Sequence, residues 1–195
     1  MKKTVLAVLF LSAAFLAFTD EIQGKKLFIT AGGGITEFDG KAAGTLSASA
    51  GTNLLPWLEG GINLTAFHTL ERSYKGTEGR DFQAESGFAA IYLRPHFVIG
   101  GKLDIGFPVQ SGSGTLLYRY EEKYRDELVW TEEILDQINY GVTSLGVDIR
   151  IALCDKHSLT LSGGYRGTSP IGSPYADKDA LNGFGAEIRY GWKLF

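Results

Sequence analysis

The segment from Asn182 to Phe195 alternates between two kinds of side chain. One set is apolar and mostly bulky, and it comprises Phe184, Ala186, Ile188, Tyr190, Trp192 and Leu194. The other set holds only glycines and charged residues, namely Gly183, Gly185, Glu187, Arg189, Gly191 and Lys193. Because successive side chains of a β-strand point to opposite sides, this period of two predicts a strand with one apolar face and one polar face.

The alternation leaves open which of the two faces is inside. A soluble barrel hides its apolar face, whereas a membrane barrel turns that face toward lipid. The interior of a barrel of about eight strands is just wide enough for side chains to fill. Tyr190 and Trp192, with comparable residues from other strands, would overfill such an interior, whereas glycines and a few paired charges would fit. The apolar face is therefore predicted to point outward.

Seven earlier segments have the same strand-like pattern: 27–35, 45–50, 57–67, 86–99, 103 toward 120, 138–153 and 159–166. In the sixth of these, Ile149 falls on the predicted outer face and Arg150 on the inner face. Pro108 and the run 111–114 (Ser-Gly-Ser-Gly) predict a bulge or a frayed edge in the fifth segment. The count gives an all-β fold class, an eight-stranded antiparallel up-and-down transmembrane β-barrel.

The connections between these segments alternate in length. Short turns are predicted at 53–56, 100–102 and 154–157, and longer polar stretches at 68–83, 121–136 and 168–181, with a briefer one at 37–41. Outer-membrane barrels have short periplasmic turns and longer extracellular loops, and this asymmetry favours the membrane interpretation. An even number of strands places both ends of the barrel on the periplasmic side.

The first residues predict export. Met1-Lys2-Lys3 is basic and 4–18 is an almost unbroken apolar run, which is typical of a secretory signal peptide over 1–19. Neither Ala14 nor Ala17 ends an ideal A-x-A triplet, so the sequence does not fix the cleavage point. The alternative, an N-terminal anchor helix, is disfavoured because the apolar run is short for a spanning helix. The barrel domain is predicted over 26–195.

Composition excludes several classes of function. The formal charge of −3 gives no basic excess for nucleic-acid binding. A single cysteine, Cys154, excludes an internal disulfide, and no CxxC, HExxH or clustered metal-ligand spacing occurs. We therefore predict no cofactor, no metal and no catalytic residue.

The terminal pattern Tyr190-x-Trp192-x-Leu194-Phe195 resembles the C-terminal signal of small eight-stranded outer-membrane barrels, like the transmembrane domain of outer membrane protein A. The stretch from Arg94-Pro95-His96 to Phe107-Pro108-Val109 is similar to chains described as outer membrane protein beta-barrel domains. The resemblance covers 27–195 and implies a fold, an outer-membrane location and recognition by the barrel-assembly machinery. It implies no reaction. One departure is visible, because Leu194 keeps the phase of the aromatics and Phe195 is one step off.

Charged residues on the predicted inner face form the first candidate site: Glu59, Arg94, Asp104, Asp148, Arg150, Arg166, Glu187, Arg189 and Lys193. They are interpreted either as the lining of an ion-selective pore or as a neutralising network of salt bridges. Burial of charges in so narrow a space requires pairing, and eight strands leave no continuous channel, so the network is favoured.

Two further candidates lie toward the predicted loops. His68, Ser73 and Asp81 offer the residue types of a lipid A-modifying enzyme, but a catalytic triad is recognised by geometry and not by presence. The acidic loop 121–136 is a candidate site for a surface ligand, or for divalent cations shared with lipopolysaccharide. His96 and His157 are predicted to be structural or solvated, and Cys154 is predicted to be a small apolar filler.

The prediction for function is an outer-membrane barrel with a structural or surface-binding role through its loops and a filled lumen. The alternatives are a small channel or transporter and, less favoured, a lipid A-modifying enzyme. The expected partners are outer-membrane lipid and lipopolysaccharide, the barrel-assembly machinery and a surface ligand.

Overall fold

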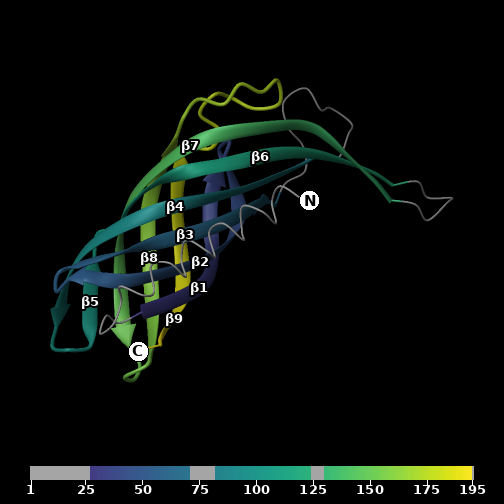
Figure 1. Ribbon diagram of the computed structural model, residues 1–195. Helices are drawn as coiled ribbons and strands as arrows, with labels where there is room; N and C mark the ends of the chain where they lie inside the picture. The colour runs from purple at the N-terminus through teal and green to yellow at the C-terminus, as the bar shows by residue number, and fades with distance from the viewer. Residues whose placement is uncertain (1–26, 71–81, 124–129, 195) are drawn as a thin grey trace.

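The computed structural model describes residues 27–70, 82–123 and 130–194 (Figure 1). It is built from antiparallel strands, which are β1 (Leu27–Phe38), β2 (Lys41–Leu55), β3 (Leu58–Thr69), β4 (Phe82–Ile99), β5 (Leu103–Gly106), β6 (Val109–Lys123), β7 (Trp130–Ala152), β8 (His157–Thr168) and β9 (Gly183–Lys193). No helix in the described part of the chain is long and apolar enough to cross a membrane.

The strands close into a barrel because β9 pairs with β1 as well as with β8. The segments β5 and β6 share one place in the ring, since each pairs with both β4 and β7. The ring therefore has eight members, which confirms the predicted fold class. The predicted irregularity at Pro108 is also confirmed, because the strand breaks at Phe107 and Pro108, and proline has no N–H to donate to the ladder.

The registers give the tilt of the strands. Successive paired residues around the ring run from Leu27 through Thr52, Gly60, Leu93, Val109, Leu145 and Tyr165 to Phe184. Gly185 pairs with Thr36, so Phe184 lies level with Glu37. One circuit of the ring thus starts at Leu27 and returns to β1 about ten residues further along, at Glu37. A stagger of this size over eight strands tilts the strands by about 40° from the barrel axis, within the usual range for barrels.

The predicted facing of the strands is confirmed. On β9, Phe184, Ile188, Tyr190 and Trp192 are exposed, whereas Glu187 and Arg189 are largely covered. On β7, Ile149 is exposed and Asp148 is buried. At this tilt each residue advances about 2.5 Å along the barrel axis, so the outward apolar run from Phe184 to Leu194 is about 25 Å tall.

Tight turns connect the strands at one end of the barrel. Pro56 and Trp57 join β2 to β3, and Gly100 to Lys102 join β4 to β5, where Gly100 and Gly101 have φ of 59° and 72°. The predicted hairpin at 100–102 is confirmed. At the opposite end, Asp39 and Gly40 join β1 to β2 with φ of 50° and 71°. The interpretation of 37–41 as a longer connection is wrong, because Asp39 and Gly40, both with left-handed backbone conformation, form a two-residue hairpin turn.

The predicted loop 121–136 is also wrong over most of its length. β6 continues to Lys123 and β7 begins at Trp130, and the two remain paired, with Glu121 opposite Glu132 and Lys123 opposite Trp130. This hairpin runs well beyond the other strands (Figure 1). A β-bulge places Tyr118 opposite Asp136 and Arg119 opposite Ile134, which leaves Leu135 as the additional residue. The polar composition of 121–136 indicated a loop, but the pairing of β6 with β7 continues through most of this segment.

The segment 169–182 contains no strand and closes the loop end of the barrel. Its buried residues Ile171, Ala176, Ala180 and Leu181 join a hydrophobic core that includes Phe38, Phe67, Leu116, Tyr118 and Tyr140 from the inner faces of the strands. Glycines and charges therefore fill only part of the lumen. The expectation that the interior excludes bulky apolar residues is wrong at this end, because the barrel is filled here in the manner of a soluble protein core.

Candidate functional site in the lumen

An ionic network fills the lumen toward the tight-turn end. Its centre is the guanidinium of Arg94 on β4, which is 1% exposed. Arg94 Nε and Nη2 donate to the Asp148 carboxylate on β7 at 2.7–3.0 Å. Nη1 and Nη2 donate to the Asp104 carboxylate on β5 at 3.1 and 3.0 Å. Two carboxylates from different strands are thus bound by one planar group, a geometry that arginine provides and lysine does not.

A second guanidinium, that of Arg150, completes the network. Arg150 donates to both oxygens of the buried Glu59, at 2.8 and 3.2 Å, and the Tyr92 hydroxyl donates to Glu59 Oε1 at 2.8 Å. The Nδ1 atom of His96 lies 3.1 Å from Asp104 Oδ1. His96 is therefore structural, as predicted.

The salt-bridge interpretation of the lumen charges is confirmed for Glu59, Arg94, Asp104, Asp148 and Arg150. Each of these groups is within 4 Å of an opposite charge. Sequence reasoning did not assign Tyr92 and His96 to the network. The sequence could have indicated both residues, because they lie two positions from Arg94 on β4 and therefore point to the same face of the strand. A cavity of about 20 Å³ lies beside the network, and the buried side chains of Glu59, Arg94 and Asp148 fill this end of the lumen.

Three other predicted lumen cations lie outside this network, and of these Arg189 forms a predicted salt bridge, with Glu187. Arg166 donates to two carbonyl oxygens, those of Leu181 at 2.7 Å and Glu37 at 2.9 Å, and its guanidinium lies 4.6 Å from the centre of the Phe67 ring. It holds the 169–182 segment against the strands and pairs with no carboxylate in the described residues. Arg189 lies 3.6 Å from Glu187, which accepts a hydrogen bond from Ser47 at 2.9 Å. Lys193 is partly exposed at the end of β9.

A cavity of about 100 Å³ separates the ionic network from the apolar cap formed by 169–182. Glu187, Arg189, Asn63, Thr45 and Arg166 contribute to its lining. The buried Asn63 Oδ1 and Thr45 Oγ1 atoms have no hydrogen-bond partner among the residues that the structure describes. This volume equals that of about three water molecules in the liquid.

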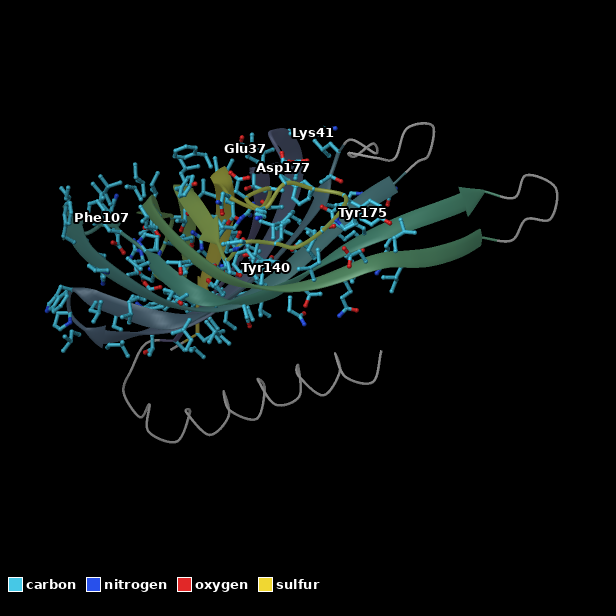
Figure 2. All side chains as sticks on the ribbon, turned by 90° about the horizontal axis from the view of Figure 1, so that it is seen from above. Glu37, Lys41, Phe107, Tyr140, Tyr175 and Asp177 are labelled. Carbon is cyan, nitrogen blue, oxygen red and sulfur yellow. The ribbon has the colours of Figure 1, made fainter. Side chains whose placement is uncertain are left out.

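The cap is fixed by contacts with three parts of the barrel. Thr168 donates to the Asn182 side chain from its N–H and its hydroxyl, and Asp39 N–H donates to the carbonyl of Ala180. The rings of Tyr175 and Tyr118 lie 5.4 Å apart. Figure 2 shows Tyr175 where the cap meets the β6–β7 hairpin. The loop end of the lumen is therefore closed as well.

The remaining candidates from the sequence do not assemble into a site. His68 lies at the loop end of β3 and points outward, with Nδ1 3.7 Å from Glu85 on β4; Ser73 and Asp81 lie outside the described residues. His157 contacts the Tyr190 hydroxyl at 2.7 Å. Cys154 is exposed, so the prediction that it fills an apolar space is wrong. Within the described ranges, no group of three or more acidic, histidine or cysteine residues could hold a metal ion.

Comparison with known proteins bears on the fold alone. No family model and no curated protein matches the chain. The crystal structure of Neisserial surface protein A is similar over 88% of this chain and 97% of that one, with a TM-score of 0.53 and 13% sequence identity. The attachment invasion locus protein Ail of Yersinia pestis, in complex with the heparin analogue sucrose octasulfate, matches over 87% of this chain and 99% of that one, with a TM-score of 0.47 and 12% identity. The chain thus has the fold of the small eight-stranded barrels found in outer membranes.

Proposed function

We propose that this chain is an outer-membrane β-barrel with a structural or surface-binding role at its loop end and a lumen that is not an open pore. The observation that carries the proposal is the outward apolar belt, which is about 25 Å tall on β9, the height expected for the lipid-facing band of a membrane barrel. In a soluble protein, an exposed apolar surface of this size would cause aggregation. The ionic network and the cap support the closed lumen.

The lengths of the connections support an orientation in the membrane. The tight-turn end lies in the periplasm and the capped end, with the β6–β7 hairpin, lies outside the cell, as in outer-membrane barrels generally. Outer-membrane lipid and lipopolysaccharide then surround the belt. The barrel-assembly machinery would recognise the C-terminal strand, in which Tyr190 and Trp192 are exposed on the outer face.

Heat modifiability with fractionation tests this proposal. We expect the protein in the outer-membrane fraction, and we expect unboiled samples to migrate differently from boiled samples on SDS gels, because a closed hydrogen-bonded ring resists detergent. Recovery from the soluble periplasm, with one gel position before and after boiling, would contradict it.

A small channel is the second candidate, because a cavity of about 100 Å³ with charged residues in its lining lies between the ionic network and the cap. Single-channel recording in planar bilayers distinguishes the two functions. We expect no stable conductance from the wild-type protein.

No catalytic role enters the proposal. His68 lies on the outer face of the barrel beside Glu85 of β4, and the proposal assigns it no reaction. A change in lipid A species between wild-type cells and cells with His68→Ala would overturn it.

A further inference from the structure

The upper part of β7 has an unpaired edge. β7 pairs with β6 from Trp130 onward, but it pairs with β8 only from Val142 to Ala152, because β8 leaves the sheet after Thr168. Beyond Thr168 the chain turns inward, and Ile171 is 1% exposed in the apolar cap. The position beside β7 that β8 would occupy is therefore empty of any strand in the described part of the chain.

The backbone groups of this edge can be assigned from the hydrogen bonds at its lower end. Gly141 N–H donates to the Ser169 hydroxyl at 2.8 Å, and Gly141 C=O accepts from Ser169 N–H at 2.9 Å. Both backbone groups of Gly141 thus point to the β8 side. Because this direction repeats every second residue, the N–H and C=O groups of Asn139 and Gln137 point to the same side. Both residues are exposed.

We propose that this edge, centred on Asn139 and Gln137, binds an extended basic segment of a partner protein as an additional strand. A row of unpaired strand donors and acceptors is a template for another extended chain. The incoming segment would continue the line of β8. The inference rests on the proposed surface location of the capped end and names the kind of partner that this end would bind.

The acidic excess of the β6–β7 hairpin indicates which kind of partner would bind at this edge. In the paired strand segments 119–123 and 130–136, which form the described part of the hairpin that carries the edge, the sequence has five acidic residues and two basic ones. This excess attracts a basic peptide and repels a second copy of the same hairpin. The Asp136 carboxylate, one residue before Gln137, contacts the cap, where it accepts a hydrogen bond from Ser173 at 3.0 Å.

The test uses the purified full-length barrel in detergent and a synthetic ten-residue peptide of alternating Lys and Thr, with binding followed by fluorescence anisotropy. Two control peptides carry Glu in place of Lys, or the original sequence with alternate backbone amides methylated. The variant Gln137→Pro/Asn139→Pro removes two edge N–H groups, and Gln137→Ala/Asn139→Ala is the matched control that keeps them. Heat modifiability verifies that each variant has folded.

We expect the Lys-Thr peptide to bind the wild type and the alanine variant equally, and the proline variant about tenfold more weakly, since two hydrogen bonds are lost. The methylated and acidic peptides should bind weakly. Equal binding to the proline variant, equal binding of the methylated peptide, or self-association of the barrel through this edge would overturn the proposal.

If the proline variant does not fold, hydrogen exchange of the wild type replaces it. The exchange of the Gln137 and Asn139 amides must slow when peptide is added, and unchanged exchange overturns the proposal. These failures leave heat modifiability and membrane fractionation intact, so they are distinguishable from failure of the proposed function.

Discussion

Replacement of Arg94 by Met tests the ionic network at its centre. The side-chain change removes every contact of the Asp148 carboxylate, which is 3% exposed and has no other hydrogen bond among the described residues. Asp104 and Glu59 are affected less, because His96 remains beside Asp104 and Arg150 remains paired with Glu59. The loss is therefore dominated by one buried, unpaired carboxylate, which costs about 3–5 kcal/mol.

The assay is urea-induced unfolding in lipid vesicles, followed by tryptophan fluorescence and by the mobility of unboiled samples on gels. Arg189→Met is the comparison variant, because the polar contacts of Arg189 among the described residues are a 3.6 Å contact with Glu187 and a hydrogen bond to Ser162. We expect it to lower the free energy of unfolding by about 1.5 kcal/mol. Adding Asp148→Asn to Arg94→Met should restore at least half of the loss, because the orphaned charge is removed. If Arg94→Met costs no more than Arg189→Met, or if Asp148→Asn restores nothing, the reasoning is refuted.

Three further predictions concern the belt, the cap and a turn. Ile188→Arg should lower the free energy of unfolding in vesicles by about 2–4 kcal/mol, whereas Asn139→Arg, above the belt, should cost about 0–1; equal costs would contradict the position of the belt. Leu181→Ala, at a fully buried position in the cap, should cost about 2–5 kcal/mol in the same unfolding assay, and no loss would mean that the cap does not pack as described. Gly101→Ala should cost about 1–2 kcal/mol because φ is positive there and no atom obstructs the new methyl group. Gly172→Ala, which is equally unobstructed and lacks a positive φ, is its control and should be neutral.

The sequence predicted the barrel because period-two alternation and turn chemistry act locally. The phase of Phe184 to Leu194 determined the outer face of β9, and Gly100-Gly101 determined a hairpin. The inward position of Glu59, Arg94 and Asp148 could be predicted in the same way, since a shift of strand register by one residue would move all of these charges to the outer face.

The errors arose where distant segments decide the outcome. The polar run 121–136 lacks a strand-like apolar pattern, yet its two halves continue the pairing of β6 and β7, whose residues Leu116, Tyr118 and Tyr140 pack in one core. The cap could not be predicted, because the burial of Ile171 and Leu181 depends on Phe38 and Phe67 from other strands. The Asp39-Gly40 turn was identifiable in principle, since Asp-Gly is a strong two-residue hairpin signal.

The most direct test of the membrane-barrel account measures the surroundings of the outward residues. Spin labels are attached to single cysteines at Ile149, Ile188 and Asn139 in a Cys154→Ser background, with the protein in lipid vesicles. The account predicts that labels at 149 and 188 collide with oxygen, which concentrates in lipid, and are shielded from a water-soluble nickel chelate, whereas the label at 139 is open to the chelate. Labels at 149 and 188 that are freely accessible to the chelate would contradict the account and indicate a barrel whose apolar face is not in lipid.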